Sequence, residues 1–253
     1  MRASYAQFIV AILVYFMNRL ILFPNELSSK SYIKLSDRRA EHIRSTLRAE
    51  KGSEIRFGLV NGPIGKASLI EDDGVTIQLS LEYSNEAPAR FKPCTLVLAL
   101  PRPKMARRLI QSICALGVEE LHLINSYKVD KSYWQSHYLS EEALAEQLVL
   151  GMEQSGSTLM PTITKHTKFR PFVEDTFPAI CSGKMSLLAH PYSQDSCPID
   201  LNQPSVLVIG PEGGFTEFEV NLLSQNGARP VHIGARILRV ETAVPAIIGR
   251  LYI

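Results

Sequence analysis

The stretch Ser205-Val-Leu-Val-Ile-Gly-Pro-Glu-Gly-Gly214 joins an apolar, strand-like run to a glycine-rich turn. Thr216 and Glu219 follow with the spacing of a capping box, so a helix is predicted over 217–225. Glycines let backbone amides approach a ligand closely, and a turn at the carboxyl end of a buried strand is where open α/β sheets hold cofactors. The stretch therefore predicts a cofactor site in an α/β domain.

The composition of this turn restricts the class of ligand that it can bind. A carboxylate at its centre, Glu212, would repel phosphate, and neither a GxxxxGK[ST] nor a GxGxxG spacing is present. The turn therefore suits a cationic or hydroxyl-rich cofactor better than a nucleotide di- or triphosphate. A tight strand-to-helix connection is the simpler alternative. Three glycines, a proline and a carboxylate within five residues favour the ligand.

A second glycine-led loop follows the apolar run at 231–233. It reads Gly234-Ala-Arg-Ile-Leu-Arg-Val-Glu-Thr-Ala243 and feeds another predicted helix, with Thr242 as its N-cap and Pro245 in its first turn. Arg239 and Glu241 lie two residues apart, so they share a side of an extended segment and either address one ligand or form a surface ion pair. Two sheet ends with such loops predict one shared crevice.

Composition bounds the class of protein. The chain has 253 residues, 45% of them hydrophobic, and a net charge of +2, which fits two globular domains and leaves any nucleic-acid affinity to local basic patches. The cysteines, Cys94, Cys114, Cys181 and Cys197, show no CxxC pairing and sit in or near apolar runs. They predict buried, reduced thiols, no metal site and a cytoplasmic protein.

The patterning divides the chain at residues 82–93, where Asn85, Pro88 and Pro93 predict a linker. Before it, short strands with Asn-Gly and Asp-Gly turns and one helix near 36–48 predict a small β-barrel-like module. After it, apolar runs alternate with helices, which predicts a parallel sheet covered on both faces. The predicted strands are 95–100, 121–124, 187–189, 205–209 and 231–233, and the predicted helices are 104–116, 140–154, 217–225 and 242–251.

The first residues form a separate question. The run Phe8–Met17 is apolar like the core of a signal peptide, yet no small-residue cleavage site follows it and it is too short to span a bilayer. Met17 to Phe23 would make a natural first strand. We therefore expect residues 1–16 to be an upstream extension without a role in function.

Basic and polar residues supply candidates for contact with RNA. Arg44, Arg48 and Lys51 are spaced to share one helix face, and Arg102, Lys104, Arg107 and Arg108 cluster beside the first strand of the larger domain. Solvated helix faces are the commoner explanation of such runs. Glu153 and Gln154 end a helix before Gly156, where they either meet a polar substrate or take part in ordinary capping. His190, just past a strand, is more often structural than catalytic.

Four motifs together resemble the RsmE family of ribosomal RNA uridine methyltransferases, in the SPOUT superfamily. They are Ile209-Gly-Pro-Glu-Gly-Gly214, Gly234-x-Arg-Ile-Leu-Arg-x-Glu-Thr-Ala243, Glu153-Gln-Ser-Gly156 and His42-Ile-x4-Arg48-x3-Gly52. The resemblance implies a PUA-like RNA-binding β-barrel over 17–84, and a SPOUT domain with a parallel sheet and a deep trefoil knot over 93–253. It also implies a homodimer that methylates N3 of a uridine in 16S ribosomal RNA, the RNA of the small subunit.

The resemblance also implies roles for individual residues. S-adenosylmethionine would be held by Ala189, His190, Gly210, Pro211, Glu212, Gly213, Gly214, Ile233, Gly234, Leu238, Thr242 and Ala243. Arg239 and Glu241 would lie near the transferred methyl group as catalytic residues. RNA would be met by Arg44, Arg48, Arg102, Lys104, Arg107, Glu153 and Gln154.

The sequence departs from the family pattern where charges are expected. The usual Lys-x-x-Glu-Leu-Gly is Ser112-Ile-Cys-Ala115-Leu-Gly117, the arginine after Glu-Gln-Ser-Gly is Ser157, and the usual Glu-Arg pair is Tyr127-Lys128. The cofactor loops are intact, whereas these charges are altered. Two alternatives therefore stand beside the first interpretation: a methyltransferase acting on another RNA or base, and a non-catalytic RNA-binding dimer with a vestigial cofactor pocket.

Overall fold

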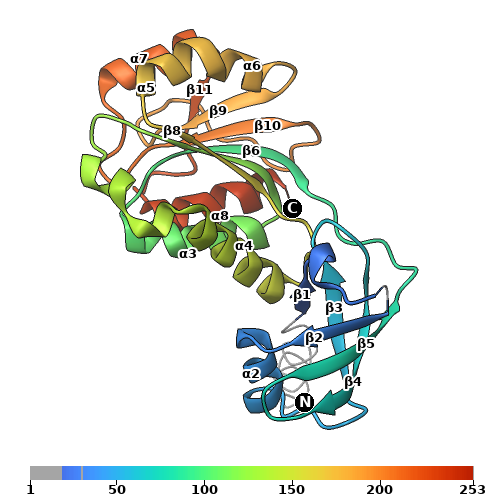
Figure 1. Cartoon of the computed structure of the whole chain (residues 1–253). Helices are drawn as coiled ribbons and strands as arrows, with labels where there is room; N and C mark the ends of the chain where they lie inside the picture. The colour runs from blue at the N-terminus through green and yellow to red at the C-terminus, as the bar shows by residue number, and fades with distance from the viewer. Residues whose placement is uncertain (1–18, 30, 253) are drawn as a thin grey trace, which may run out of the picture. The chain divides into compact units, whose positions relative to one another are not determined.

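The chain divides into two compact units in the computed structural model, which describes residues 19–29 and 31–252 (Figure 1). One unit runs to Arg90 and takes in Met152–Met160, and the other comprises Phe91–Gly151 and the chain from Pro161 onward. The expected extension 1–16 and the expected strand start at Met17 lie outside the described residues. The larger predicted domain is continuous from residue 93, whereas the structure assigns its short segment Met152–Met160 to the first unit.

The first unit is built on one five-stranded sheet in the order β1-β3-β4-β5-β2. β1 runs parallel to β3, and the other neighbours are antiparallel. Along β5, Ile77, Leu79 and Leu81 are buried at alternate positions, as the period of two in a strand requires. The strands are β1 (Leu20–Leu22), β2 (Tyr32–Leu35), β3 (Glu54–Leu59), β4 (Ile64–Asp72) and β5 (Ile77–Tyr83).

Between β2 and β3 the first unit contains the α-helix α2 (Arg38–Ser45), and a short 3-10 turn, η1 (Pro24–Glu26), follows β1. Asp37 caps α2 by accepting a hydrogen bond from the Arg39 amide at 2.9 Å. The buried Arg39 guanidinium is bonded to both Glu26 and Asp37. Burial opposes its charge, but these two carboxylates together raise the pKa of Arg39.

The segment Met152–Met160, which belongs to the first unit by its contacts, packs on the turn between β3 and β4. The Thr158 carbonyl accepts a hydrogen bond from the Asn61 amide at 2.7 Å, and its hydroxyl donates to the Gly62 carbonyl at 2.9 Å. Thr158 is fully buried. The Asn-Gly turn expected from the sequence, with Asn61 at a φ of +53°, is therefore held by a segment far along the chain.

The second unit is built on a six-stranded sheet in which every neighbouring pair is parallel, in the order β11-β9-β10-β6-β7-β8. This confirms the α/β class and the parallel sheet predicted from the sequence. Ser205–Ile209 forms β10, which is buried along its whole length between β9 and β6. The other strands are β6 (Lys92–Ala99), β7 (Val118–Ile124), β8 (Thr162–His166), β9 (Met185–Ala189) and β11 (Arg229–Val231).

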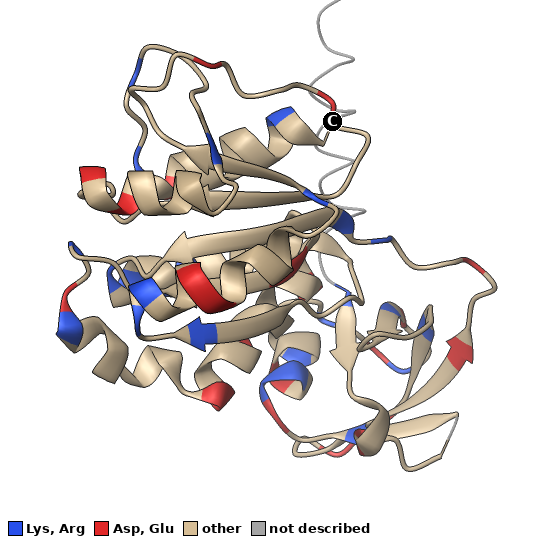
Figure 2. Ribbon diagram, turned by 90° about the horizontal axis from the view of Figure 1, so that it is seen from above, with Lys and Arg blue, Asp and Glu red and all other residues tan. Residues whose placement is uncertain are grey.

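Helices cover both faces of this sheet, with α3, α4 and α8 on one side and α5, α6 and α7 on the other (Figure 1). Charged residues gather mainly on the helices and loops, and the middle of the sheet is nearly free of them (Figure 2). The α-helices are α3 (Pro103–Ala115), α4 (Glu141–Ser155), α5 (Phe169–Pro171), α6 (Phe177–Cys181), α7 (Glu217–Gln225) and α8 (Val240–Leu251). The shorter turns are η2 (Lys131–Gln135), η3 (His137–Leu139) and the π-helical η4 (Phe172–Thr176).

Two parts of the second unit differ from the sequence prediction. The predicted strand at 231–233 is shifted, because β11 begins at Arg229 and ends at Val231; Pro230 is tolerated because β11 is an edge strand. The opposite edge strand, β8, was missed because its sequence, Thr-Ile-Thr-Lys-His, is polar and largely exposed. Edge strands lack the apolar run by which buried strands are found.

The segment between β9 and β10 packs against two later parts of the chain. Its residue Cys197 donates an amide hydrogen bond to the His232 carbonyl at 2.7 Å, just after β11. Further on, the Leu201 amide bonds to the Leu251 carbonyl at the end of α8, at 2.6 Å.

All four cysteines are free thiols, and three of them, Cys94, Cys114 and Cys197, are buried. Over residues 19–29 and 31–252, no helix has both the length and the apolarity needed to cross a membrane.

Candidate functional site

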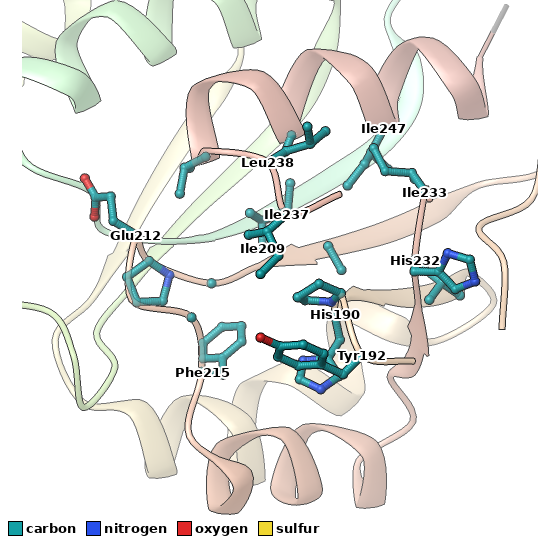
Figure 3. Close-up of a pocket in the computed structure, with 18 of the residues that line it drawn as sticks. His190, Tyr192, Ile209, Glu212, Phe215, His232, Ile233, Ile237, Leu238 and Ile247 are labelled. Atoms are coloured by element: carbon teal, nitrogen blue, oxygen red, sulfur yellow. The ribbon is translucent and has the colours of Figure 1, made fainter. Parts of the chain in front are cut away.

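A pocket of about 410 Å³ opens where β9, β10 and β11 end. These three strands are neighbours in the sheet and parallel, so their carboxyl ends meet at one edge. In Figure 3, Leu238 and Ile247 lie toward one side of the pocket, and Tyr192 and Phe215 lie toward the other. Both glycine-led loops of the sequence line this pocket, as the prediction of one shared crevice required.

The Gly210–Gly214 turn has the geometry that its glycines allow. Gly214 adopts a φ of +69°, a left-handed conformation that favours glycine, and its amide donates to the Pro211 carbonyl at 2.8 Å. A Cβ at Gly210 would lie 3.1 Å from the ring of Phe215. The capping box is confirmed, because Thr216 and Glu219 exchange hydrogen bonds at the start of α7. The turn is therefore compact and leads directly into a well-capped helix.

The carboxylate of Glu212 has a structural partner. Its Oε1 accepts a hydrogen bond from the Arg102 amide at 3.0 Å, just before α3 begins. In Figure 3 the carboxylate of Glu212 points away from the middle of the pocket. The sequence predicted that the negative charge of Glu212 lies at the centre of the ligand site, whereas in the structure its carboxylate is hydrogen-bonded on the outer side of the turn.

The second loop runs from His232 to the start of α8 and is more open. Gly234 has a φ of +140°, and its amide donates to Nδ1 of His232 at 3.1 Å. Arg239 is the N-cap residue, so α8 begins at Val240, two residues before the predicted N-cap Thr242. The prediction for Thr242 is wrong because the backbone already turns into the helix at Arg239, whose carbonyl accepts the Thr242 and Ala243 amides. Pro245 accordingly lies inside α8 rather than in its first turn.

Arg239 and Glu241, the predicted catalytic pair, lie beside the pocket without lining it. Their nearest charged atoms, Nη1 of Arg239 and Oε1 of Glu241, are 4.0 Å apart, and the Arg239 side chain is 86% exposed. An ion pair this exposed contributes little to stability. Arg239 is therefore not fixed by its neighbour, and its position directly after the pocket residue Leu238 leaves it accessible to a bound substrate.

Comparison with known proteins identifies the family. The model of the RNA methyltransferase domain family matches residues 88–252. The ribosomal RNA small subunit methyltransferase E of Treponema pallidum is 30% identical, over 90% of this chain and 88% of its own length. The chain belongs to the ribosomal RNA small subunit methyltransferase E family. A second member, ribosomal RNA small subunit methyltransferase E 1 of Borreliella burgdorferi, is 26% identical over 91% of this chain and 95% of its own length.

A solved structure of the methyltransferase E family shares the fold. The crystal structure of the Neisseria gonorrhoeae member, bound to S-adenosyl methionine, matches with a TM-score of 0.73 at 23% identity. The match covers 92% of this chain and 95% of the other. The similarity therefore extends through both units described above.

Several residues that line the pocket of this methyltransferase E family member were not among the predicted ones. Phe215 directly follows Gly214, and Tyr192 lies two residues after His190, so extending each predicted segment by two residues would have found them. Lys128 had been noted only as a departure from the family pattern, and its place in the pocket was not predicted because it comes from the separate loop after β7. Eleven of the twelve predicted cofactor residues line the pocket; Thr242 does not.

His190 is one of the predicted residues that line the pocket. Its imidazole lies edge-on to Tyr192, with 5.7 Å between ring centroids. Burial lowers the pKa of His190, so the imidazole is uncharged at neutral pH. It therefore presents a neutral polar group to whatever the pocket holds.

The predicted basic face of the first unit does not exist. Helix α2 ends at Ser45, and Arg48 has a φ of +49°, so Arg44, Arg48 and Lys51 do not share a helix face. The guanidinium of Arg44 is also bonded to both oxygens of Asp72, at 2.7 to 2.9 Å. The prediction of a shared helix face from the regular spacing is wrong because the helix ends three residues before Arg48.

The other RNA candidates have varied surroundings. In the first unit, Glu153 forms a two-bond ion pair with Arg38 at 2.9 and 3.0 Å, and Gln154 is exposed. In the second unit, Arg102 and Lys104 are exposed at the start of α3. Arg107 donates to Gln147 at 3.3 Å and lies over the ring of Tyr138 at 6.0 Å. Arg102 and Lys104 therefore remain the freer cations of this set.

Proposed function

We propose that this chain transfers a methyl group from S-adenosylmethionine to N3 of a uridine in 16S ribosomal RNA of the small subunit. One observation carries the proposal: both glycine-led loops line a single pocket at the carboxyl ends of three parallel strands. Membership of the methyltransferase E family supports the reaction, and the relatives' names support small-subunit RNA as substrate.

The residues present fit this cofactor. Ile209, Leu238 and Ile247 give the pocket an apolar wall that suits a flat adenine ring, and the glycine turns bring backbone amides and carbonyls within reach of ribose hydroxyls. We propose that the predicted set binds the cofactor, with Thr242 acting through the position of its neighbour Ala243. When bound, S-adenosylmethionine supplies an electrophilic methyl group attached to a sulfonium sulfur.

The chain must supply the rest of the chemistry. N3 of uridine carries a weakly acidic imide proton, so methylation requires loss of that proton and stabilisation of negative charge on the flanking carbonyls. We propose that the exposed guanidinium of Arg239 stabilises this charge. Glu241, whose side chain is 30% exposed, or solvent takes the proton.

We propose that RNA is bound through both units. The first unit, a PUA-like barrel over 17–84 together with the segment Met152–Met160, contacts the RNA backbone through Arg48 and Gln154. Arg102, Lys104 and Arg107 do so from the rest of the SPOUT domain proposed over 93–253. Arg44 and Glu153 contact RNA from within the ion pairs that they make with Asp72 and Arg38.

We also propose a deep trefoil knot, a homodimer and a cytoplasmic location. The knot is supported by the segment after β9, which bonds both to the residues after β11 and to the end of α8. The homodimer is implied by the family resemblance. The location follows from ribosomal RNA as the proposed substrate.

The decisive experiment removes the protein from its host and maps modified uridines in small-subunit RNA by mass spectrometry. Loss of one N3-methyluridine, restored when purified protein is added to subunits lacking the mark, supports the proposal. Loss of a different modification would favour another RNA base as the target, a possibility that Ser112, Ala115 and Ser157 raise by replacing charges of the family pattern. Unchanged RNA together with normal cofactor binding would refute the proposed substrate.

A further inference from the structure

The loop that follows β7 contacts the glycine turn at the edge of the pocket, where Lys128 is one of the lining residues. Nζ of Lys128 donates a hydrogen bond to the Gly213 carbonyl at 2.7 Å. The aliphatic stem of Lys128 lies against the same residue, since a Cβ on Gly213 would be 2.8 Å from its Cδ. A side chain at Gly213 would therefore require the stem of Lys128 to move, so the two residues are packed against each other.

The residue before Lys128 is attached to α7, the helix that follows the turn. Oε1 of Glu219 accepts a hydrogen bond from the Tyr127 amide at 2.7 Å, and Oε2 accepts from the amide and hydroxyl of Thr216 at 2.8 and 2.9 Å. Glu219 is only 3% exposed. A capping box needs the bonds to Thr216 alone, so the bond to Tyr127 is an added link between α7 and the loop after β7.

These contacts form one continuous connection. Glu219 fixes the backbone at Tyr127, which places the next residue, Lys128, over Gly213. An exposed lysine loses side-chain entropy when its chain is held in one conformation, so an incidental contact would gain little. Two consecutive residues are thus anchored, one to the turn and one to the helix that follows it, which indicates that the contact is not incidental.

We propose that Lys128 is a positioning residue that holds the Gly210–Gly214 turn in the conformation that binds S-adenosylmethionine. The inference rests on the proposed function for the identity of the ligand. Lys128 acts through the Gly213 carbonyl, and Glu219 keeps Lys128 in place.

The test compares three variants by calorimetric titration with S-adenosylmethionine. Lys128→Met keeps the apolar stem and removes the donor, so the Kd should rise by about 2- to 10-fold, the value of one hydrogen bond. Lys128→Arg keeps a donor and should bind within about 2-fold of the wild type. Lys131→Met, at an exposed lysine of η2 outside the pocket, controls for the loss of charge. Equal affinity of Lys128→Met and the wild type would overturn the proposal.

A second measurement separates this inference from the identity of the ligand. Amide hydrogen exchange of residues 210–216 in the ligand-free protein should be faster in Lys128→Met than in the wild type, and unchanged in Lys131→Met. If the wild type does not bind S-adenosylmethionine, the proposed function fails while the exchange result still decides the role of Lys128. Unchanged exchange in Lys128→Met would refute that role whatever the ligand is.

A third test measures whether substitutions at Gly213 and Lys128 have coupled effects on the binding of S-adenosylmethionine. Gly213→Ala places a Cβ against the Lys128 stem, so it should weaken binding in the wild type and weaken it less in a Lys128→Ala background. Additive effects would show that the two residues do not act together.

Discussion

The two glycine-led loops of the pocket differ in how the rest of the chain holds them. The Gly210–Gly214 turn is bonded on three sides: to Lys128 through Gly213, to Arg102 through Glu212, and to α7 through the Thr216–Glu219 capping box. The second loop is mostly exposed, with 69% of Ile237 accessible. One loop is preformed by distant residues, and the other presents free side chains. We infer that both loops hold the cofactor, and that the exposed side chains of the second loop also address the substrate.

The largest expected effect tests the second loop. Arg239→Ala should lower the methylation rate by roughly 10²–10³-fold, because it removes the proposed stabilisation of charge on the uridine carbonyls. Affinity for S-adenosylmethionine should stay within about 2-fold of the wild type, because Arg239 does not line the pocket. Single-turnover kinetics and calorimetry measure the two quantities. Arg170→Ala, at an exposed arginine of α5, is the control; a wild-type rate in folded Arg239→Ala would remove the catalytic role.

The next effect tests the support of the first turn. Glu219→Ala leaves the Tyr127 and Thr216 amides without their buried acceptor, so the free energy of unfolding should fall by about 2–3 kcal/mol. Glu217→Ala, at an exposed position of the same helical turn, should change it by less than about 0.5 kcal/mol. Urea denaturation measures both variants. A similar loss in the two would mean that helix charge, rather than the buried bonds, matters.

A third, smaller effect concerns the backbone of the second loop. Gly234 has a φ of +140°, which a residue with a Cβ adopts only under strain, so Gly234→Ala should cost about 1 kcal/mol of stability and weaken cofactor binding. Gly249→Ala, inside α8 with open space around it, should be neutral or slightly stabilising. Thermal unfolding with and without S-adenosylmethionine compares them. If Gly234→Ala behaves like Gly249→Ala, the loop rearranges without cost and is less ordered than its geometry indicates.

The sequence predicted those parts of the fold that depend on neighbouring residues. The buried strand Ser205–Ile209 and the capping box at Thr216 are local patterns, and both are present as expected. The polar edge strand β8 and the strand β11 with its proline carry weak local signals, so their existence or bounds were missed. Met152–Met160 joined the first unit through bonds to Asn61 and Gly62, which no local pattern could reveal.

The site shows the same division. Glycine motifs located both loops of the pocket, because the backbone conformation that they permit is a local property. The partners of the turn come from separate loops, so Lys128 was not predicted, and the partner of Glu212 was unknown. The sequence therefore predicted that the Glu212 carboxylate faces the ligand, whereas in the structure it accepts a hydrogen bond from the Arg102 amide.

The smallest expected effect decides whether Glu212 acts through its charge on the ligand or through its hydrogen bond to the Arg102 amide. Glu212→Gln keeps an oxygen that can accept from the Arg102 amide and removes only the charge, whereas Glu212→Ala removes both. If the bond to Arg102 is what matters, the glutamine variant should bind S-adenosylmethionine within about 2-fold of the wild type, and the alanine variant about 2- to 10-fold more weakly. If the charge attracts the sulfonium cation, both variants should lose affinity alike, and only the wild type should weaken markedly with added salt. Because the carboxylate points away from the middle of the pocket in Figure 3, we expect the first result.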